Sequence, residues 1–387
     1  MSRDLILVSL SLMTWGVGEG MFYFFQPLYM QQLGANPVMI GMILGIIGFT
    51  MMISHLPAGY ISDRIGRRPV LILAWLIGCS ATWIMGLANT LPVFVAGSAL
   101  YGFTSFVVAP LNGYITTARG KMSVGRALTL ISASFNVGAI LGPILGGLIG
   151  NRYGLGSSFR VAGFVFLLST ITIFFIKPQP VSPPIHSNLR KGARSLLSLL
   201  YIKYLILIFF VMFALYLPIP LSQNFLQNER GINLVKIGQL LSARSAGVVI
   251  LSLTLGQLNA RIGFLITQVG MALFTLLILR NGGFLSYIIA YILLGSFQTA
   301  RNLAVAQGRL LINKANMGLG YGMMETVMSI AMLLAPPLAG ILYSRDPTWI
   351  YIVSFILICL SLLITIIFSP IKTEMVEAGL PEELELT

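Results

Sequence analysis

Four charged residues inside long apolar runs are the first candidates for chemistry in this sequence. They are two acids, Glu19 and Glu325, and two arginines, Arg244 and Arg301. A charge at membrane depth is costly, so it marks a site that binds an ion, carries a proton or forms a pair. We interpret Glu19, midway along the first apolar run, as a solute-binding or proton-carrying group. Arg301 and Glu325 can pair, for structure or for function, and Arg244 is expected to have a structural role.

Aromatic and amide residues share helical faces with these charges. Trp15, Glu19, Phe22 and Gln26 follow the spacing i, i+4, i+7 and i+11, which is one face of a helix. Such a lining suits a bulky apolar or amphiphilic solute better than a sugar, which needs more hydrogen-bond partners. Further candidate lining residues lie on three other apolar runs: Tyr101 and Asn112, Tyr216 and Gln223, and Gln298 beside Arg301.

The composition indicates which solvent surrounds these residues. The chain is 57% hydrophobic and 9% charged, whereas soluble domains carry about 25% charged residues. Most of the chain must therefore face lipid. The net charge of +13 is spread over short gaps between apolar runs, and this excludes a nucleic-acid binding face. Two cysteines and two histidines do not predict a metal or cofactor site.

Twelve apolar runs are long enough to cross a bilayer, since a spanning helix needs about 20 residues. We therefore predict an all-α polytopic membrane protein whose substrate is a small molecule. A membrane enzyme or receptor is the alternative class, but the clustered His, Asp or Cys residues typical of an enzyme site are not present in the sequence. The predicted spans are 5–30, 38–60, 70–88, 93–117, 127–149, 159–176, 204–224, 237–258, 264–280, 284–306, 320–343 and 349–368.

The twelve runs divide into two sets of six. The segment 177–203 is rich in proline and basic residues, which is typical of a linker. It separates a predicted bundle at 1–176 from a second at 204–368, and an acidic tail at 369–387 follows. With the N-terminus inside, sixteen Lys and Arg lie on the cytoplasmic side and six on the other. This predicts a multi-pass protein of the cytoplasmic (inner) membrane with both termini cytoplasmic.

The two halves also form an internal repeat with an offset of 197 residues. The offset places Gly41 on Gly238 and Gly59 on Gly256, and it aligns the Arg-Ile-Gly triplets at 64–66 and 261–263. Parallel repeats of this kind are typical of transporters whose binding site lies between the halves near mid-membrane.

The loop between the second and third runs has the sequence GYISDRIGRRP at 59–69. It resembles the signature of the major facilitator superfamily, whose members have twelve helices in two six-helix halves. The resemblance implies a gating latch that holds the halves together in the outward-facing state. Simple anchoring by positive charge explains the arginines but not the acid or the glycines. The implied latch residues are Gly59, Asp63, Arg64, Gly66, Arg67 and Arg68.

The fifth run carries GAILGPILGG at 138–147, which resembles the antiporter motif found in exporters of this superfamily. Glycines four residues apart line one helix face and permit close helix packing, while Pro143 allows a bend. The eleventh run carries APPLAG at 335–340, which is a looser copy of this motif. The motif residues are Gly138, Gly142, Pro143, Gly146 and Gly147.

These features together predict a secondary transporter that works by alternating access and resembles the multidrug efflux branch. We expect export of bulky apolar or amphiphilic molecules, with the proton as the candidate coupling ion. Many proton antiporters of the family carry an arginine in the fourth helix, and this sequence has Ser98 there. That departure keeps an uncoupled facilitator, or a lipid or lysolipid carrier, as the alternative.

Overall fold

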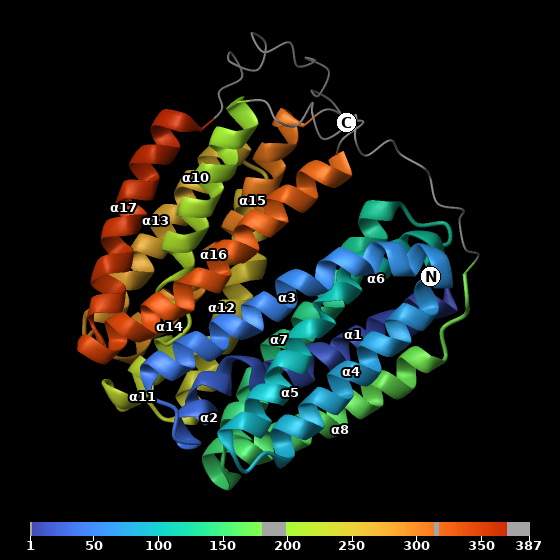
Figure 1. Cartoon of the computed structure of the whole chain (residues 1–387), viewed down its shortest axis with the longest axis horizontal. Coiled ribbons are helices and arrows are strands. Elements are labelled where there is room, and N and C mark those ends of the chain that lie inside the picture. The colour runs from blue at the N-terminus through green and yellow to red at the C-terminus, as the bar shows by residue number, and fades with distance from the viewer. Residues whose placement is uncertain (1, 180–198, 313–316, 370–387) are drawn as a thin grey trace. The chain divides into compact units, whose positions relative to one another are not determined.

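The computed structural model describes residues 2–179, 199–312 and 317–369, and their regular secondary structure is entirely helical (Figure 1). Eleven helical spans in this part are long and apolar enough to cross a membrane. A twelfth forms if Leu91–Val107 and Pro110–Ala118 count as one span bent by 42°. Most of the predicted linker (180–198) and of the acidic tail (370–387) lies outside the described residues.

The first six predicted spans correspond to eight α-helices and two short 3-10 segments. Four of these spans are single helices, and the other two are each interrupted by a 3-10 segment. The bounds are α1 (Arg3–Phe22), η1 (Tyr23–Phe25), α2 (Gln26–Gln32), α3 (Pro37–Ile65), α4 (Arg67–Leu87), α5 (Leu91–Phe103), η2 (Thr104–Val107), α6 (Val108–Ala118), α7 (Val124–Tyr153) and α8 (Leu155–Phe174).

The second half of the chain follows the same plan after the linker. Its first span is followed by a short helix, as α2 follows α1. The bounds are α10 (Leu199–Tyr216), α11 (Ser222–Asn228), α12 (Leu234–Leu255), α13 (Ala260–Leu279), α14 (Gly283–Leu294), α15 (Ser296–Gly308), η3 (Arg309–Leu311), α16 (Met317–Arg345) and α17 (Trp349–Phe368).

The helices group into two compact units. Unit 1 contains residues 1–185 together with 220–246 and 336–347, and unit 2 contains the rest. Unit 1 therefore includes α11, the first part of α12 and the last third of α16. Within it, α1 packs against α7 and α8, and α4 packs against α5 and α8. The six-plus-six division of the sequence remains a prediction.

Unit 2 is organised around α13, which packs against α14, α15 and α17. Polar contacts tie these helices together where apolar packing alone has no directional preference in lipid. Gln268 on α13 donates to Thr365 Oγ1 on α17 at 3.1 Å and accepts from Ser361 at 2.8 Å. Tyr204 on α10 donates to the carbonyl oxygen of Ala304 on α15 at 2.7 Å.

Local sequence signals explain where several helices begin and turn. The side chains of Ser2, Asn36 and Ser123 cap the N-termini of α1, α3 and α7 by accepting backbone N–H bonds. Gly66 joins α3 to α4 in one residue with a φ of 90°. This left-handed conformation favours glycine, so the glycine between the arginines of the 59–69 loop is required by the turn itself.

Three predicted spans are less regular than the apolar runs suggested. The first is interrupted by the 3-10 segment at Tyr23–Phe25, and the tenth breaks between α14 and α15 at Gly295. The fourth bends where Pro110 follows η2. A proline lacks the N–H that a helix needs and clashes with the preceding turn. An apolar run therefore predicts that a span exists but not that it is straight.

Candidate functional site

Glu19 lies in a cluster of aromatic rings contributed by three helices of unit 1. The indole Nε1 of Trp15 donates to a carboxylate oxygen of Glu19 at 3.0 Å. The rings of Trp15 and Tyr101 stack with centroids 6.1 Å apart, and Trp15 also contacts Phe166 at 4.5 Å. Glu19 itself is half-buried. The site combines one half-buried carboxylate with aromatic rings that are themselves buried.

Most other predicted lining residues of this half are buried by neighbouring helices. Phe22 is fully buried, with its ring 5.0 Å from Tyr101 and 5.6 Å from Phe159. Gln26 is also buried, whereas Asn112 on α6 is exposed. The structure thus brings Trp15, Glu19, Phe22 and Tyr101 together, and it separates Asn112 onto an exposed surface.

The predicted residues of the second half fall into two groups. Gln223 on α11 is buried in unit 1. Tyr216 on α10 is partly exposed in unit 2, and its ring lies 5.3 Å from Phe297 on α15. Gln298, next to Phe297, is partly exposed.

The arginines of the 59–69 loop bind two other helices of unit 1, Arg67 in the middle of α6 and Arg68 at the C-terminal end of α8. Arg67 donates through Nη1 to the carbonyl oxygen of Gly113 at 2.8 Å and to Thr117 Oγ1 at 2.7 Å, both on α6. Arg68 donates to the carbonyl oxygen of Phe174, the last residue of α8, at 3.0 Å. Carbonyls at a helix C-terminus have no intrahelical partner, and a cation there is favourable. The side chains of Asp63 and Arg64 and the surroundings of Gly59 lie outside the described residues, so the latch remains a prediction.

One face of α7 packs backbone to backbone against α1. A Cβ added to Gly138, Gly142 or Gly146 would clash with a carbonyl oxygen of α1, in order those of Met13, Val17 and Met21. From the other side, a Cβ on Gly20 would lie 2.7 Å from Cδ of Pro143. The glycine spacing therefore lets α7 lie directly on the helix that carries Glu19.

Beside the proline of the same motif, carbonyl oxygens of α7 accept hydrogen bonds from α12. Because Pro143 has no N–H, the carbonyl oxygen of Ala139 four residues earlier loses its helical donor. Ser245 on α12 donates to this oxygen at 3.1 Å. One residue further along α7, the carbonyl oxygen of Ile140 accepts from Ser242 at 2.6 Å. The two serines of α12 thus take up backbone groups beside the proline, and the sequence interpretation missed both.

Two glycines, which are repeat partners, form matching close contacts with proline-containing helices. A Cβ on Gly238 of α12 would clash with the carbonyl oxygen of Pro143 and lie 3.3 Å from Cα of Gly147. We call this the α7–α12 interlock. A Cβ on Gly41 of α3 would likewise clash with the carbonyl oxygen of Pro336 and lie 3.2 Å from Cα of Gly340 on α16; we call this the α3–α16 interlock. All six residues belong to unit 1.

Amide side chains join α2 and α11 within unit 1. Gln31 donates to Asn228 Oδ1 at 3.3 Å, and its own amide oxygen accepts from Asn224 at 2.6 Å. Asn224 also donates to the carbonyl oxygen of Pro27 at 3.3 Å. The pairs Gln31–Asn228 and Pro27–Asn224 are each 197 residues apart, the offset of the sequence repeat. We call Gln31, Asn224 and Asn228 the amide cluster. The repeat offset was the signal that could have identified it.

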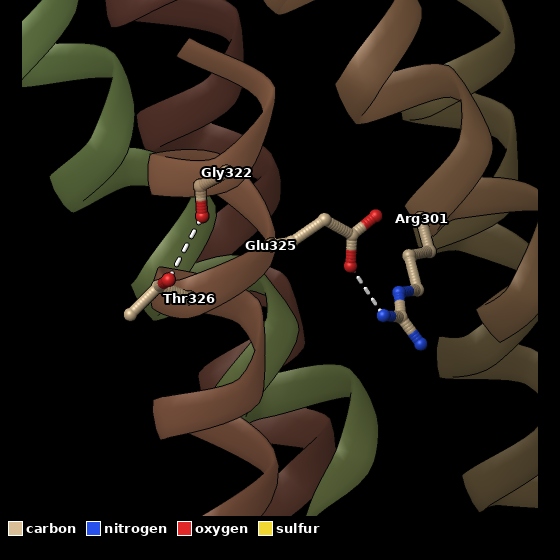
Figure 2. A network of polar contacts seen from close by, with 4 residues as sticks. All are labelled: Arg301, Gly322, Glu325 and Thr326. Atoms are coloured by element: carbon tan, nitrogen blue, oxygen red, sulfur yellow. Dashed lines mark hydrogen bonds and ion pairs between the residues drawn. The ribbon is translucent and has the colours of Figure 1, made fainter. Parts of the chain in front are cut away.

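Arg301 and Glu325 form an ion pair in unit 2. Figure 2 shows the carboxylate of Glu325 on α16 pointing toward the guanidinium of Arg301 on α15. The two side chains are 25% and 47% exposed, respectively. Thr326, the next residue on α16, instead donates to the carbonyl oxygen of Gly322 in its own helix at 2.8 Å.

The fourth intramembrane charge, Arg244, contacts an aromatic ring. Its guanidinium carbon lies 4.4 Å from the ring centroid of Phe24, a cation–π contact within unit 1. Phe24 belongs to the 3-10 segment that interrupts the first span. Among the residues that the structure describes, no group of three or more His, Cys, Asp or Glu side chains could hold a metal ion.

The sequence matches the profile of the Major Facilitator Superfamily over residues 8–263 and 204–384. Among curated proteins, it is 32% identical to the multidrug resistance protein MdtG of Escherichia coli over 202 residues, which is 50% of each chain. It is 24% identical over 182 residues to an uncharacterized MFS-type transporter of Methanocaldococcus jannaschii, or 47% of each chain. These alignments span about half the length of the curated relatives.

Solved structures match over nearly the whole chain. The nucleoside transporter NupG has a TM-score of 0.78 at 13% identity, covering 97% of this chain and 99% of that one. A bacterial homolog of the human lysosomal transporter Spinster, in an inward-facing and occupied conformation, has a TM-score of 0.74 at 13% identity, covering 96% and 97%. At these identities the likeness shows the fold alone, and it confirms the predicted polytopic all-helical architecture.

Proposed function

Because the chain belongs to the Major Facilitator Superfamily, we propose that it is an alternating-access exporter of bulky apolar or amphiphilic molecules that exchanges them for protons. The family and fold are those of membrane transporters rather than enzymes. The similarity to a multidrug resistance protein supports an efflux substrate of low chemical specificity. The predicted orientation places both termini in the cytoplasm.

The observation that carries this proposal is the half-buried carboxylate of Glu19 among aromatic rings. An antiporter needs a group that holds a proton in one state and releases it in another, and a carboxyl group in a membrane span is suited to this role. The hydrogen bond from Trp15 orients the carboxylate, and the buried ring of Tyr101 stacks on Trp15 and holds the indole in place. Proton and apolar solute would then compete for one small region of the first half.

The packing of α7 offers a path from this region to the rest of unit 1. Glu19 lies on α1, and Gly138, Gly142 and Gly146 let α7 pack directly against the backbone of α1. A neighbouring face of α7, about 100° around the helix, forms the α7–α12 interlock and accepts hydrogen bonds from the hydroxyl groups of Ser242 and Ser245. A shift of α1 when Glu19 gains or loses its proton would therefore move α7 against α12.

We assign the two interlocks and the amide cluster to a gate on the non-cytoplasmic side. By the predicted orientation, the loop after the first span, which follows Gln31, is non-cytoplasmic. The contacts at the gate are backbone to backbone or amide to amide. They lose little when water replaces them, because each amide and carbonyl can bond to water instead. Such a gate can close tightly and still open at modest energetic cost.

Glu19→Gln tests the proposal in proteoliposomes that contain the full chain, with the dye ethidium as the probe and an imposed proton gradient. The variant should lose proton-driven accumulation of the dye and keep both dye binding and dye exchange without a gradient. Glu229→Gln is the matched control, because Glu229 is an exposed acid that directly follows α11. Full proton-driven accumulation in the Glu19 variant would refute the role of Glu19 as the proton carrier.

Two other results would redirect the interpretation. Loss of dye binding in Glu19→Gln would make Glu19 a direct ligand for a cationic solute. Dye flux that never exceeds equilibration in the unmodified protein would support the uncoupled alternative. Ser98, which occupies the position of the missing arginine, favours that alternative, because it is buried and donates to the carbonyl oxygen of Phe94 in its own helix at 3.0 Å.

A further inference from the structure

The pair of Arg301 and Glu325 is not used by the mechanism proposed above. Both residues lie within membrane-spanning segments, yet their side chains keep 25% and 47% of their surface exposed. Charged groups in such segments avoid lipid and face water or one another. The exposed surface of the pair must therefore face either lipid or water.

The exposed residues of the same two helices indicate which of these the pair faces. Leu334 is exposed on the part of α16 that belongs to unit 2, and at about 100° per residue it lies roughly 180° around the helix from Glu325. On α15, which begins after the break in the tenth span, the exposed residues nearest Arg301 are Asn302 and Ala306, and no large apolar side chain of α15 is exposed. Glu325 thus lies on the side of α16 away from an exposed apolar residue, and Arg301 pairs with it, so we assign the exposed surface of the pair to the water-accessible side.

The guanidinium of Arg301 has capacity for a further partner. In the described residues, its one hydrogen bond runs from Nη2 to Glu325. Arginine offers five N–H donors in a planar fork, which binds carboxylate or phosphate with two parallel hydrogen bonds. Phe297, one turn before Arg301 on α15, is itself buried, but the ring of Tyr216 that packs 5.3 Å from it is partly exposed and supplies aromatic surface about one helical turn from this cation. An aromatic anion would find both of the features it needs here.

We propose that Arg301 binds the acidic group of an amphiphilic aromatic anion, such as a carboxylate or sulfonate, and that Glu325 is the internal counter-ion that this ligand displaces. This proposal deepens the proposed transport function and rests on it for the identity of the ligand as a transported solute. The exchange costs less than breaking a buried ion pair, since the displaced carboxylate is already 47% exposed and becomes hydrated instead of stranded.

Binding to the full chain in lipid nanodiscs tests the proposal with three ligands of one shape: 1-naphthoate, 1-naphthylmethylammonium and 1-naphthalenemethanol. Isothermal titration calorimetry, corrected with empty nanodiscs, should show that the unmodified protein prefers the anion to the neutral alcohol. Arg301→Gln should weaken naphthoate binding at least tenfold and leave alcohol binding unchanged. Glu325→Gln should tighten naphthoate binding about tenfold, because the competing carboxylate is gone.

Two further variants keep the test decisive. Arg309→Gln removes an exposed arginine that follows α15 and should leave naphthoate binding unchanged. Arg301→Lys keeps the positive charge and should retain part of the binding even if Arg301→Gln fails to fold. A Glu325→Gln protein that is folded but binds naphthoate no better, or worse, would overturn the proposal and make the pair structural. Ethidium export that depends on Glu19 can survive that result, so the two proposals fail separately.

Discussion

Substitution of Gly238 by alanine should open the proposed gate. The new Cβ would clash with the carbonyl oxygen of Pro143 and lie 3.3 Å from Cα of Gly147. A real Cβ almost never approaches within 3 Å of such atoms, so α12 and α7 would have to separate locally. Overpacking of this kind costs about 1–3 kcal/mol. Alanine also favours the helix by about 1 kcal/mol over glycine, but this gain is the same with the gate open or closed.

The clash alone therefore changes the relative populations of the open and the closed gate. A bias of about 1–3 kcal/mol corresponds to about a 5–150-fold shift toward the state in which α7 and α12 are apart. Spin labels at Gln32 and Glu229, exposed residues beside the amide cluster, report this as a longer distance in pulsed electron resonance. Gly41→Ala should shift the same distance, because it breaks the α3–α16 interlock.

Gly322→Ala is the matched control for this experiment. Gly322 is also in a helix, but a Cβ there meets no atom within 4 Å, so the substitution adds helix propensity without a clash. The label distances should stay those of the unmodified protein. If Gly238→Ala left the distances unchanged in a folded protein, or if Gly322→Ala shifted them equally, the interlock would not control the gate.

The remaining predictions concern the contacts that hold unit 1 together. Gly142→Leu should abolish transport while the protein still inserts, because the side chain would displace α1 at Val17; normal dye export by this variant would show that the close contact is dispensable. Arg67→Gln should lower the free energy of unfolding by about 1–3 kcal/mol, the range for hydrogen bonds from a charged donor, measured as a fall in melting temperature against Arg126→Gln, which removes an exposed arginine near the start of α7.

The sequence predicted the number and approximate limits of the spans because each is an independent apolar run of bilayer length. It did not predict which polar face lines a solute path. Trp15 and Phe22 share a face with Glu19, yet both are buried by neighbouring helices. In a bilayer, lipid and protein neighbours are both apolar, so helical periodicity does not separate a packed face from a lining face.

The contacts of Pro143 show a second limit of sequence reasoning. The motif around it predicted close packing and a bend, but its partner serines are about a hundred residues away in the chain. A hydroxyl group that satisfies a distant carbonyl leaves no local pattern in the sequence. The amide cluster differs in this respect, because the repeat offset links Gln31 to Asn228 and could have paired them from the sequence alone.

The contact of Gln31 with Asn228 has a consequence for the origin of the duplicated chain. Residues that are repeat partners and touch each other occupy the position that, in a two-fold symmetric dimer of half-length chains, meets its own copy. Only a self-complementary side chain suits such a position. An amide both donates and accepts, whereas a carboxylate or an ammonium group would face its own charge. In a fused chain each of the two positions can change by itself. The present glutamine and asparagine differ by one methylene, and they retain the amide pairing that a symmetric ancestor would have required.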